Sequence, residues 1–119
     1  MKILLLLKNR IMNKKQMQDD IRYKLSEGQN WMCPISGVKF IQNDEGRVID
    51  PTTNKAVSVD HDHTTGYIRG ICIQKVNWLL DQWEQNSYGN LSKPPELSNY
   101  QKKPPAFDII GKVKYSNYW

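Results

Sequence analysis

The chain has 119 residues and a mass of 13.9 kDa, enough for one domain with a small core but not for two. With 39% hydrophobic residues, four Trp, six Tyr, two Phe and a mean hydropathy of −0.69, the composition excludes both a disordered chain and a membrane span. The formal net charge is +5, yet residues 56–86 carry four acidic and only two basic side chains. Basic ends suit a phosphate backbone and an acidic centre suits a divalent cation, although charge alone also fits a merely basic soluble protein.

Two features bear on the compartment. Cys33 and Cys72 are too few for the disulfide framework of a small secreted protein. The apolar run at residues 3–7 is flanked by lysines and is shorter than the core of a signal peptide. We therefore expect a cytoplasmic protein with no membrane partner.

The first third of the chain predicts a helix followed by a turn. Apolar residues recur every three to four positions over residues 9–27, and Gly28 is placed to end the pattern, so we assign an N-terminal helical arm to residues 1–30. Residues 31–40 contain a proline and a glycine between apolar side chains, which predicts a hairpin-type knuckle. Residues 43–55 are polar and rich in turn formers, which predicts a surface loop with one short strand at 47–49.

The middle of the chain has a sharper pattern. Residues 56–63 begin with apolar and polar alternation, 64–66 form a turn, and 67–72 read as a returning strand. Residues 74–85 then carry apolar side chains at helical spacing. Residues 31–86 are thus predicted to hold the knuckle and a core of two strands and one helix.

The last segment, residues 87–119, has two proline pairs and a glycine, so it cannot form one long helix. We predict an extended tail that wraps the core, with a short strand at 108–113. The whole is predicted to be one α+β domain over residues 1–119.

The residues with catalytic chemistry are concentrated at the end of the first predicted core strand. Hydrolysis of a phosphodiester needs a hard cation, a base for water and groups that contact the phosphate oxygens. Asp60 and Asn77 supply the oxygen ligands that Mg²⁺ prefers. His61 has an imidazole that is largely neutral at pH 7 and can accept a proton from water. Neighbours on an extended strand point apart, which would put base and cation on opposite sides of a phosphate.

A longer pattern contains these residues. The segment DHDHTTGYIRG at 60–70, followed by Asn77, resembles the recombination endonuclease VII family of phage nucleases, within the HNH or ββα-metal superfamily. The segment LSEGQNWMCPISG at 25–37 extends the similarity, which covers residues 21–85. The resemblance implies a small ββα-metal core and an endonuclease that cuts double-stranded or branched DNA with one divalent cation, Mg²⁺ or Mn²⁺. It would act in the host cytoplasm if phage-encoded, and homodimerisation is left open.

The resemblance also implies roles for particular residues. Asp60 and Asn77 would be the metal ligands, His61 the general base, and His63 an orienting or phosphate-contacting residue. Arg69 and Lys75 are candidates for DNA binding, but the guanidinium of Arg69 could instead brace an acidic neighbour such as Asp62.

The sequence departs from the family at its zinc site. Family members bind a structural zinc through two Cys-x-x-Cys pairs, and the matching positions here are Cys33, Ser36, Ile73 and Val76. A closed zinc site needs four ligands, so we predict no structural zinc, with apolar packing of Ile73 and Val76 against Ile35 in its place. Cys72 lies one residue before a ligand position and is expected to face away, because neighbouring strand residues alternate.

Two further positions weaken the predicted site. Some family members have a histidine two residues before the metal-binding aspartate and an acidic residue one turn after the asparagine. Ser58 and Leu80 occupy these positions here. The alternative function is therefore a catalytically inactive protein on the same scaffold that binds DNA or a host protein.

Overall fold

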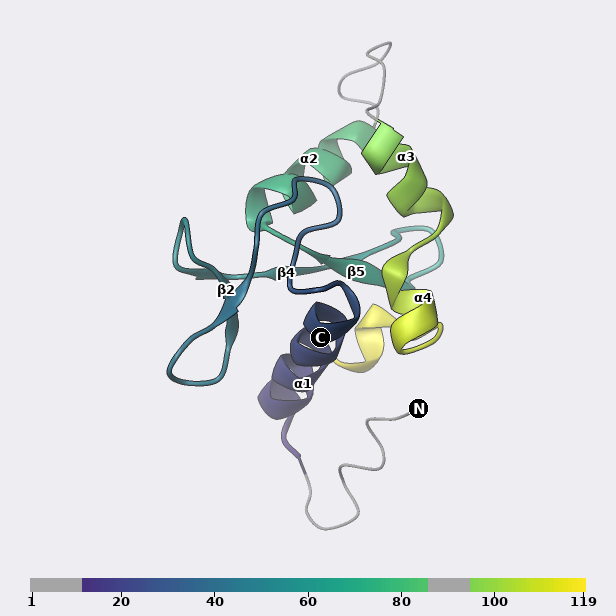
Figure 1. The fold of residues 1–119 in the computed structure, drawn as a ribbon. Coiled ribbons are helices and arrows are strands. Elements are labelled where there is room, and N and C mark those ends of the chain that lie inside the picture. The colour runs from purple at the N-terminus through teal and green to yellow at the C-terminus, as the bar shows by residue number, and fades with distance from the viewer. Residues whose placement is uncertain (1–11, 86–94) are drawn as a thin grey trace.

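The computed structural model describes residues 12–85 and 95–119, which form a mixed α+β fold (Figure 1). Its elements in chain order are α1 (Lys14–Gly28), β1 (Ile41–Gln42), β2 (Val48–Asp50), β3 (Lys55–Ala56), β4 (Ser58–His61), β5 (Ile68–Cys72), α2 (Gln74–Glu84), α3 (Pro95–Lys102), α4 (Pro105–Ile109) and the 3₁₀-helix η2 (Tyr115–Asn117). The predicted α+β class is confirmed. The start of the predicted N-terminal arm and the first part of the predicted tail lie outside the described residues.

Helix α1 begins at a capping box, which explains why it starts later than the hydrophobic pattern. The Asn13 side chain accepts a hydrogen bond from the Gln16 backbone N–H, and the Gln16 side chain accepts one from the Asn13 N–H. The helix ends at Gly28 as predicted. A Cβ atom on Gly28 would lie 2.3 Å from the Ile109 side chain, so glycine is needed for the close packing of α1 against α4.

The knuckle and the segment after it are more regular than a surface loop. Met32 and Lys39 form an isolated antiparallel bridge, and Gly37 makes the turn between them with φ of +77°. Strands β1, β2 and β3 then form an antiparallel sheet in that order. The predicted short strand is confirmed as β2. Its neighbours β1 and β3 were not predicted. Val48 and Ile49 of β2 are buried in the core.

The centre of the fold is the predicted unit of two strands and one helix. Strands β4 and β5 form an antiparallel hairpin, and α2 follows directly and packs on both strands. Helix α1 packs on the hairpin from the other side, as Figure 1 shows. Ile68, Ile71 and Leu80 are completely buried between these layers. The order β4, β5, α2 fits a ββα core.

The prediction of an extended tail is wrong for residues 95–119, which contain two short helices. Pro95 and Pro105 are the first residues of α3 and α4, where a missing backbone N–H has no helical partner to lose. The predicted strand at 108–113 is also absent, and Lys114 instead bridges Tyr67. The tail does wrap the core, because it passes β5 and ends beside α1 (Figure 1).

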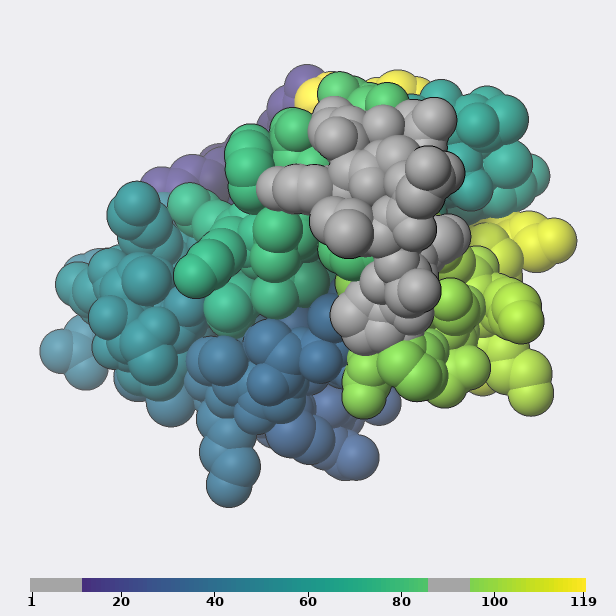
Figure 2. Space-filling model, turned by 90° about the horizontal axis from the view of Figure 1, so that it is seen from above, coloured from purple at the N-terminus to yellow at the C-terminus, as the bar shows by residue number. Residues whose placement is uncertain are grey.

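The outer side of α2 is open to solvent. Trp78 is 54% exposed, and Lys75 is exposed one turn before it. In the view from above, α2 forms part of the surface beside the blue knuckle (Figure 2). Within residues 12–85 and 95–119, the helices are all too short or too polar to cross a bilayer.

Candidate active site

A break in the hairpin register separates the two central residues of the predicted site. Asp60 pairs with Gly70, but His61 pairs with Ile68, so the ladder is irregular between Asp60 and His61. Such an irregularity changes the direction of the side chains that follow it. The Asp60 side chain is buried in the core side of the hairpin, whereas His61 is only half-buried. The expectation that the two side chains point apart stays a prediction.

The Asp60 carboxylate is held by three hydrogen bonds. Arg69 donates from Nε to Oδ2 at 2.7 Å and from Nη2 to Oδ1 at 3.0 Å, and the Tyr100 hydroxyl donates to Oδ2 at 2.8 Å. Burial raises the pKa of Asp60, and the hydrogen bonds and charge of Arg69 oppose that rise. Gly70 leaves space for this contact, because a Cβ there would lie 3.1 Å from the Tyr100 hydroxyl. The carboxylate is thus fixed in one orientation.

Arg69 braces two acids, neither of which is Asp62. Besides Asp60, it donates from Nη1 to Glu84 Oε2 at 2.7 Å, and Glu84 also accepts a hydrogen bond from Gln101. The Arg69 side chain is only 5% exposed. The bracing role considered from the sequence is present, but the expected acid was wrong because the Asp62 carboxylate instead accepts backbone N–H bonds in its own turn. DNA binding by Arg69 and by the exposed Lys75 stays a prediction.

The two histidines lie together at the end of the hairpin. The ring centroids of His61 and His63 are 4.8 Å apart, and His63 Nε2 lies 3.5 Å from Asp81 Oδ1 on α2. Burial lowers the pKa of His61, and the neighbouring His63 adds to the effect. Among residues 12–85 and 95–119, the His61 ring has no hydrogen-bond partner. Burial and His63 thus both favour the neutral form of the His61 imidazole.

Asn77 lies on α2, one helical turn before Asp81. Positions four apart share a helix face, so Asn77 and Asp81 lie on the side of α2 that faces the hairpin end. In the described part of the chain, the buried Oδ1 of Asn77 has no hydrogen-bond partner. A buried acceptor without a donor costs about 1–3 kcal/mol. A bound cation would remove that cost.

Asp60 and Asn77 each carry an oxygen of the kind that a hard divalent cation prefers. Asp60 Oδ1 accepts only one of the three hydrogen bonds to its carboxylate and keeps a lone pair, and Asn77 Oδ1 is unpaired. Mg²⁺ takes oxygen ligands and retains several waters, so two protein ligands are sufficient for it. The described residues contain no cluster of three or more His, Cys, Asp or Glu side chains that could hold a metal. A cation site formed jointly by Asp60 and Asn77 therefore stays a prediction.

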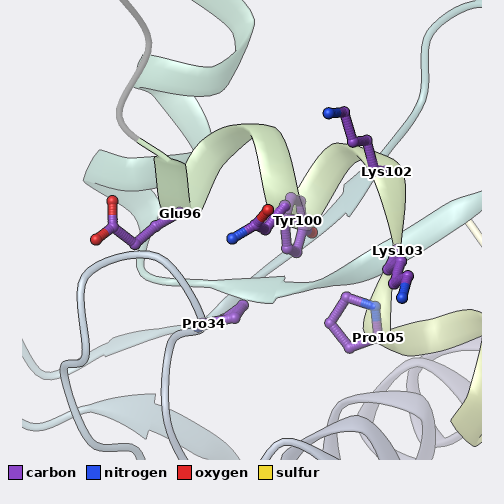
Figure 3. A pocket seen from close by; sticks show the side chains of 7 residues that line it. Pro34, Glu96, Tyr100, Lys102, Lys103 and Pro105 are labelled. Atoms are coloured by element: carbon purple, nitrogen blue, oxygen red, sulfur yellow. The ribbon is translucent and has the colours of Figure 1, made fainter.

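Cavities adjoin the neighbours of the candidate residues, whereas Asp60, His61 and Asn77 line none of the four described cavities. A cavity of about 360 Å³ adjoins the histidine end of the hairpin and is lined by Asp62, His63, Thr64, Arg69, Glu84, Gln85 and Gln101. A second one of about 500 Å³ lies between the knuckle and α3 and is lined by Pro34, Glu96, Asn99, Tyr100, Lys102, Lys103 and Pro105 (Figure 3). The larger cavity reaches the candidate site only through Tyr100. The smaller one is therefore the better candidate for substrate access.

A contact between two free cysteines links the knuckle to β5. Cys33 and Cys72 are both buried free thiols, and their side chains hydrogen-bond to each other. The expectation that Cys72 faces away from the knuckle is wrong, because β5 is buried along its whole length and the knuckle covers the Cys72 side. Ile73 and Val76 are buried in the core, and Ile35 packs against it, in line with the predicted apolar replacement.

The absence of a structural zinc stays a prediction. Two cysteines provide half of the ligands that a closed zinc site needs, and Ile73 and Val76 provide none. We expect metal analysis of the purified protein to find less than one tightly bound zinc per chain. A stoichiometric zinc that survives dialysis against a chelator would contradict the prediction.

Comparison with known proteins places the chain. A family model described as recombination endonuclease VII matches residues 8–94, which is more than half of the chain. The chain belongs to the recombination endonuclease VII family. The "Gene 59 protein" of Mycobacterium phage D29 is 37% identical over 57 residues, which are 48% of this chain and 33% of that protein. The match thus spans about a third of the length of this relative. No solved structure matches the chain.

Family membership confirms the resemblance drawn from the sequence. The endonuclease VII match ends before α3, so Tyr100 and Tyr115 lie outside it. Both nevertheless contact the site, with Tyr100 bonded to Asp60 and Tyr115 stacked on His61. Sequence reasoning missed these residues because no local pattern connects them to the hairpin. Asp81 and Glu84 were also missed, although their positions on the face of α2 that carries Asn77 were a usable signal.

Proposed function

We propose that this chain is a metal-dependent endonuclease that hydrolyses phosphodiester bonds in double-stranded or branched DNA, as a phage protein in the host cytoplasm. Membership in a nuclease family supports the reaction class. One observation carries the proposal. At the register shift between Asp60 and His61, the Asp60 carboxylate is buried, whereas the His61 imidazole is half-exposed beside His63.

The protein residues would divide the reaction between them. A Mg²⁺ or Mn²⁺ ion held by Asp60 and Asn77 would supply positive charge at the departing 3′ oxygen. His61 would accept a proton from the water that attacks phosphorus, because a neutral imidazole is an effective base near pH 7. His63, beside the smaller cavity, would contact a phosphate oxygen. The products would be 5′-phosphate and 3′-hydroxyl ends.

Two other groups would hold the reacting residues in place. Arg69 fixes the Asp60 carboxylate through two parallel hydrogen bonds, a geometry that determines orientation as well as charge. Asp81 lies close enough to His63 to orient its ring. Lys75, exposed on α2, would contact the DNA backbone as a positive charge. A branched substrate has two strands to cut, so homodimerisation would bring two sites to it.

Nicking of supercoiled plasmid and of a four-way junction tests the proposal. Cleavage is expected with Mg²⁺ or Mn²⁺ and is expected to stop in EDTA and return when excess metal is added. The ends should be religated by DNA ligase, which needs a 5′-phosphate and a 3′-hydroxyl. No cleavage with either metal on plasmid, linear or branched DNA would contradict the proposal.

The alternative is an inactive protein that binds DNA or a host protein on the same scaffold. The observation that favours it is the full engagement of Asp60 Oδ2 by Arg69 and Tyr100, together with the buried Leu80 where some relatives have an acid. This alternative predicts DNA binding without cleavage in every metal condition. The nicking assay and a binding assay on the same preparation separate the two functions.

A further inference from the structure

The end of the chain returns to the proposed catalytic hairpin. The Ile68 N–H donates to the Val113 carbonyl at 2.8 Å, and the Tyr115 N–H donates to the Gly66 carbonyl at 2.8 Å. These bonds attach residues 113–115 to the turn and to the start of β5. The segment lies outside the part of the chain that matches the family model. Its contacts with the site are thus a feature of this chain's own tail.

The tail places an aromatic ring on the imidazole of His61. The centroids of the His61 and Tyr115 rings are 4.0 Å apart, and their planes are inclined by 13°. Tyr115 stacks in turn on Trp119, with centroids 4.8 Å apart and planes inclined by 8°. The Arg22 guanidinium lies over the Trp119 ring at 5.8 Å. The result is a continuous stack from α1 to the candidate base.

Hydrogen bonds within the protein hold the Trp119 end of the stack in place. Gln18 on α1 donates a hydrogen bond to the Tyr118 carbonyl at 2.6 Å, which holds the chain end against the helix. Arg22 is held in turn by a hydrogen bond to the Val57 carbonyl. Trp119 therefore has a fixed position, and it fixes Tyr115. Rotation of the His61 side chain would break the contact with Tyr115.

The same geometry argues against a role for Tyr115 as a platform for DNA bases. Base stacking needs an aromatic ring with an open face. Tyr115 has two near-parallel ring neighbours, His61 and Trp119, and two such neighbours occupy the two faces of one ring. The contact on the His61 side therefore acts on the imidazole and not on the substrate.

We propose that Tyr115 is a positioning residue that holds the His61 imidazole in the orientation needed to accept a proton from water. The inference rests on the proposed function, because it assigns to the tail a part of the same catalytic site. A base that is free to rotate spends less time aligned with the attacking water, and small misplacements of reacting groups can cost about 10²-fold in rate.

The test compares three variants on the DNA substrate that the wild type cleaves. Tyr115→Leu removes the ring, and we expect kcat to fall about 10- to 100-fold with KM unchanged. Tyr115→Phe keeps the stack without the hydroxyl and should recover most of the rate. Tyr23→Leu is the matched control, because Tyr23 is also half-buried but contacts Trp31 and not the site, so its kcat should equal that of the wild type.

An NMR measurement makes the test independent of activity. In the wild type, stacking on Tyr115 should shift the carbon-bound ring protons of His61 upfield, and Tyr115→Leu should abolish the shift while Tyr115→Phe keeps it. Full kcat in Tyr115→Leu, a raised KM as its only effect, or the absence of the upfield shift would overturn the inference. An inactive wild type that shows the shift would instead overturn the proposed function, and with it the catalytic role of Tyr115.

Discussion

Replacing His61 with alanine is expected to reduce DNA cleavage by about 10²- to 10⁴-fold, the usual contribution of a general base. The side chain is half-buried, has a pKa lowered by burial, and makes ring contacts with His63 and Tyr115. Its removal leaves Asp60 and Arg69 paired. DNA affinity should therefore remain near the wild-type value, and gel shift in EDTA measures it separately from single-turnover cleavage.

His63→Ala provides the comparison for this prediction. His63 is 50% exposed and lies beside Asp81, so its loss should cost less than the loss of His61. Addition of imidazole is expected to restore part of the activity of His61→Ala by occupying the empty space next to Tyr115. Cleavage by His61→Ala at the wild-type rate would show that another group is the base.

Replacing Arg69 with methionine is expected to lower the free energy of unfolding by about 3–5 kcal/mol, because the change leaves the buried Asp60 carboxylate without its charged partner. The Asp60 and Arg69 side chains are 1% and 5% exposed, so water cannot replace the lost hydrogen bonds. Glu84 also loses its charged partner, but it keeps the hydrogen bond from Gln101 and is partly exposed, so its contribution is smaller. Urea unfolding followed by tryptophan fluorescence measures the loss.

A double variant separates the loss of the ion pair from a loss of packing. Asp60→Asn combined with Arg69→Met removes the unpaired charge and should be more stable than Arg69→Met alone. Lys24→Met is the control, because the side chains of the Lys24–Asp20 ion pair are 24% and 21% exposed, so this pair is less buried than Asp60–Arg69 and is expected to contribute about 1 kcal/mol or less. Equal stability losses in Arg69→Met and Lys24→Met would contradict the role of the buried pair.

The local pattern was sufficient to predict the hairpin, the helix after it and the end of α1. In α2 the helical spacing of apolar residues agrees with the burial of Val76 and Leu80, and Gly28 ends α1 where the packing against Ile109 requires glycine. The sequence predicted only one of the three strands of the β1–β3 sheet, because strands of two or three residues are too short to show an alternating pattern. The extended tail differs from the structure because a proline breaks a helix only in its interior, whereas Pro95 and Pro105 are the first residues of α3 and α4.

The candidate site was predictable where its residues are close in sequence or share a motif. Asp60, His61 and His63 follow one another along the hairpin end, and Asn77 follows at a helical position that the family pattern marks. Tyr100 and Tyr115 were not predictable, because their contacts with Asp60 and His61 depend on tertiary packing. Tyr100 meets Asp60 across 40 positions of the sequence, and nothing in its own neighbourhood indicates that contact.

The central claim is that Asp60 and Asn77 bind one divalent cation, and manganese binding measured by electron paramagnetic resonance tests it most directly. Asn77→Leu removes the buried amide oxygen while nearly keeping the volume, and Asn99→Leu makes the same change on α3 away from the site. We expect the wild type and Asn99→Leu to bind one Mn²⁺ per chain, in competition with Mg²⁺, and Asn77→Leu to bind at least tenfold more weakly, about 1.4 kcal/mol. Equal Mn²⁺ affinity in all three proteins would contradict the claim.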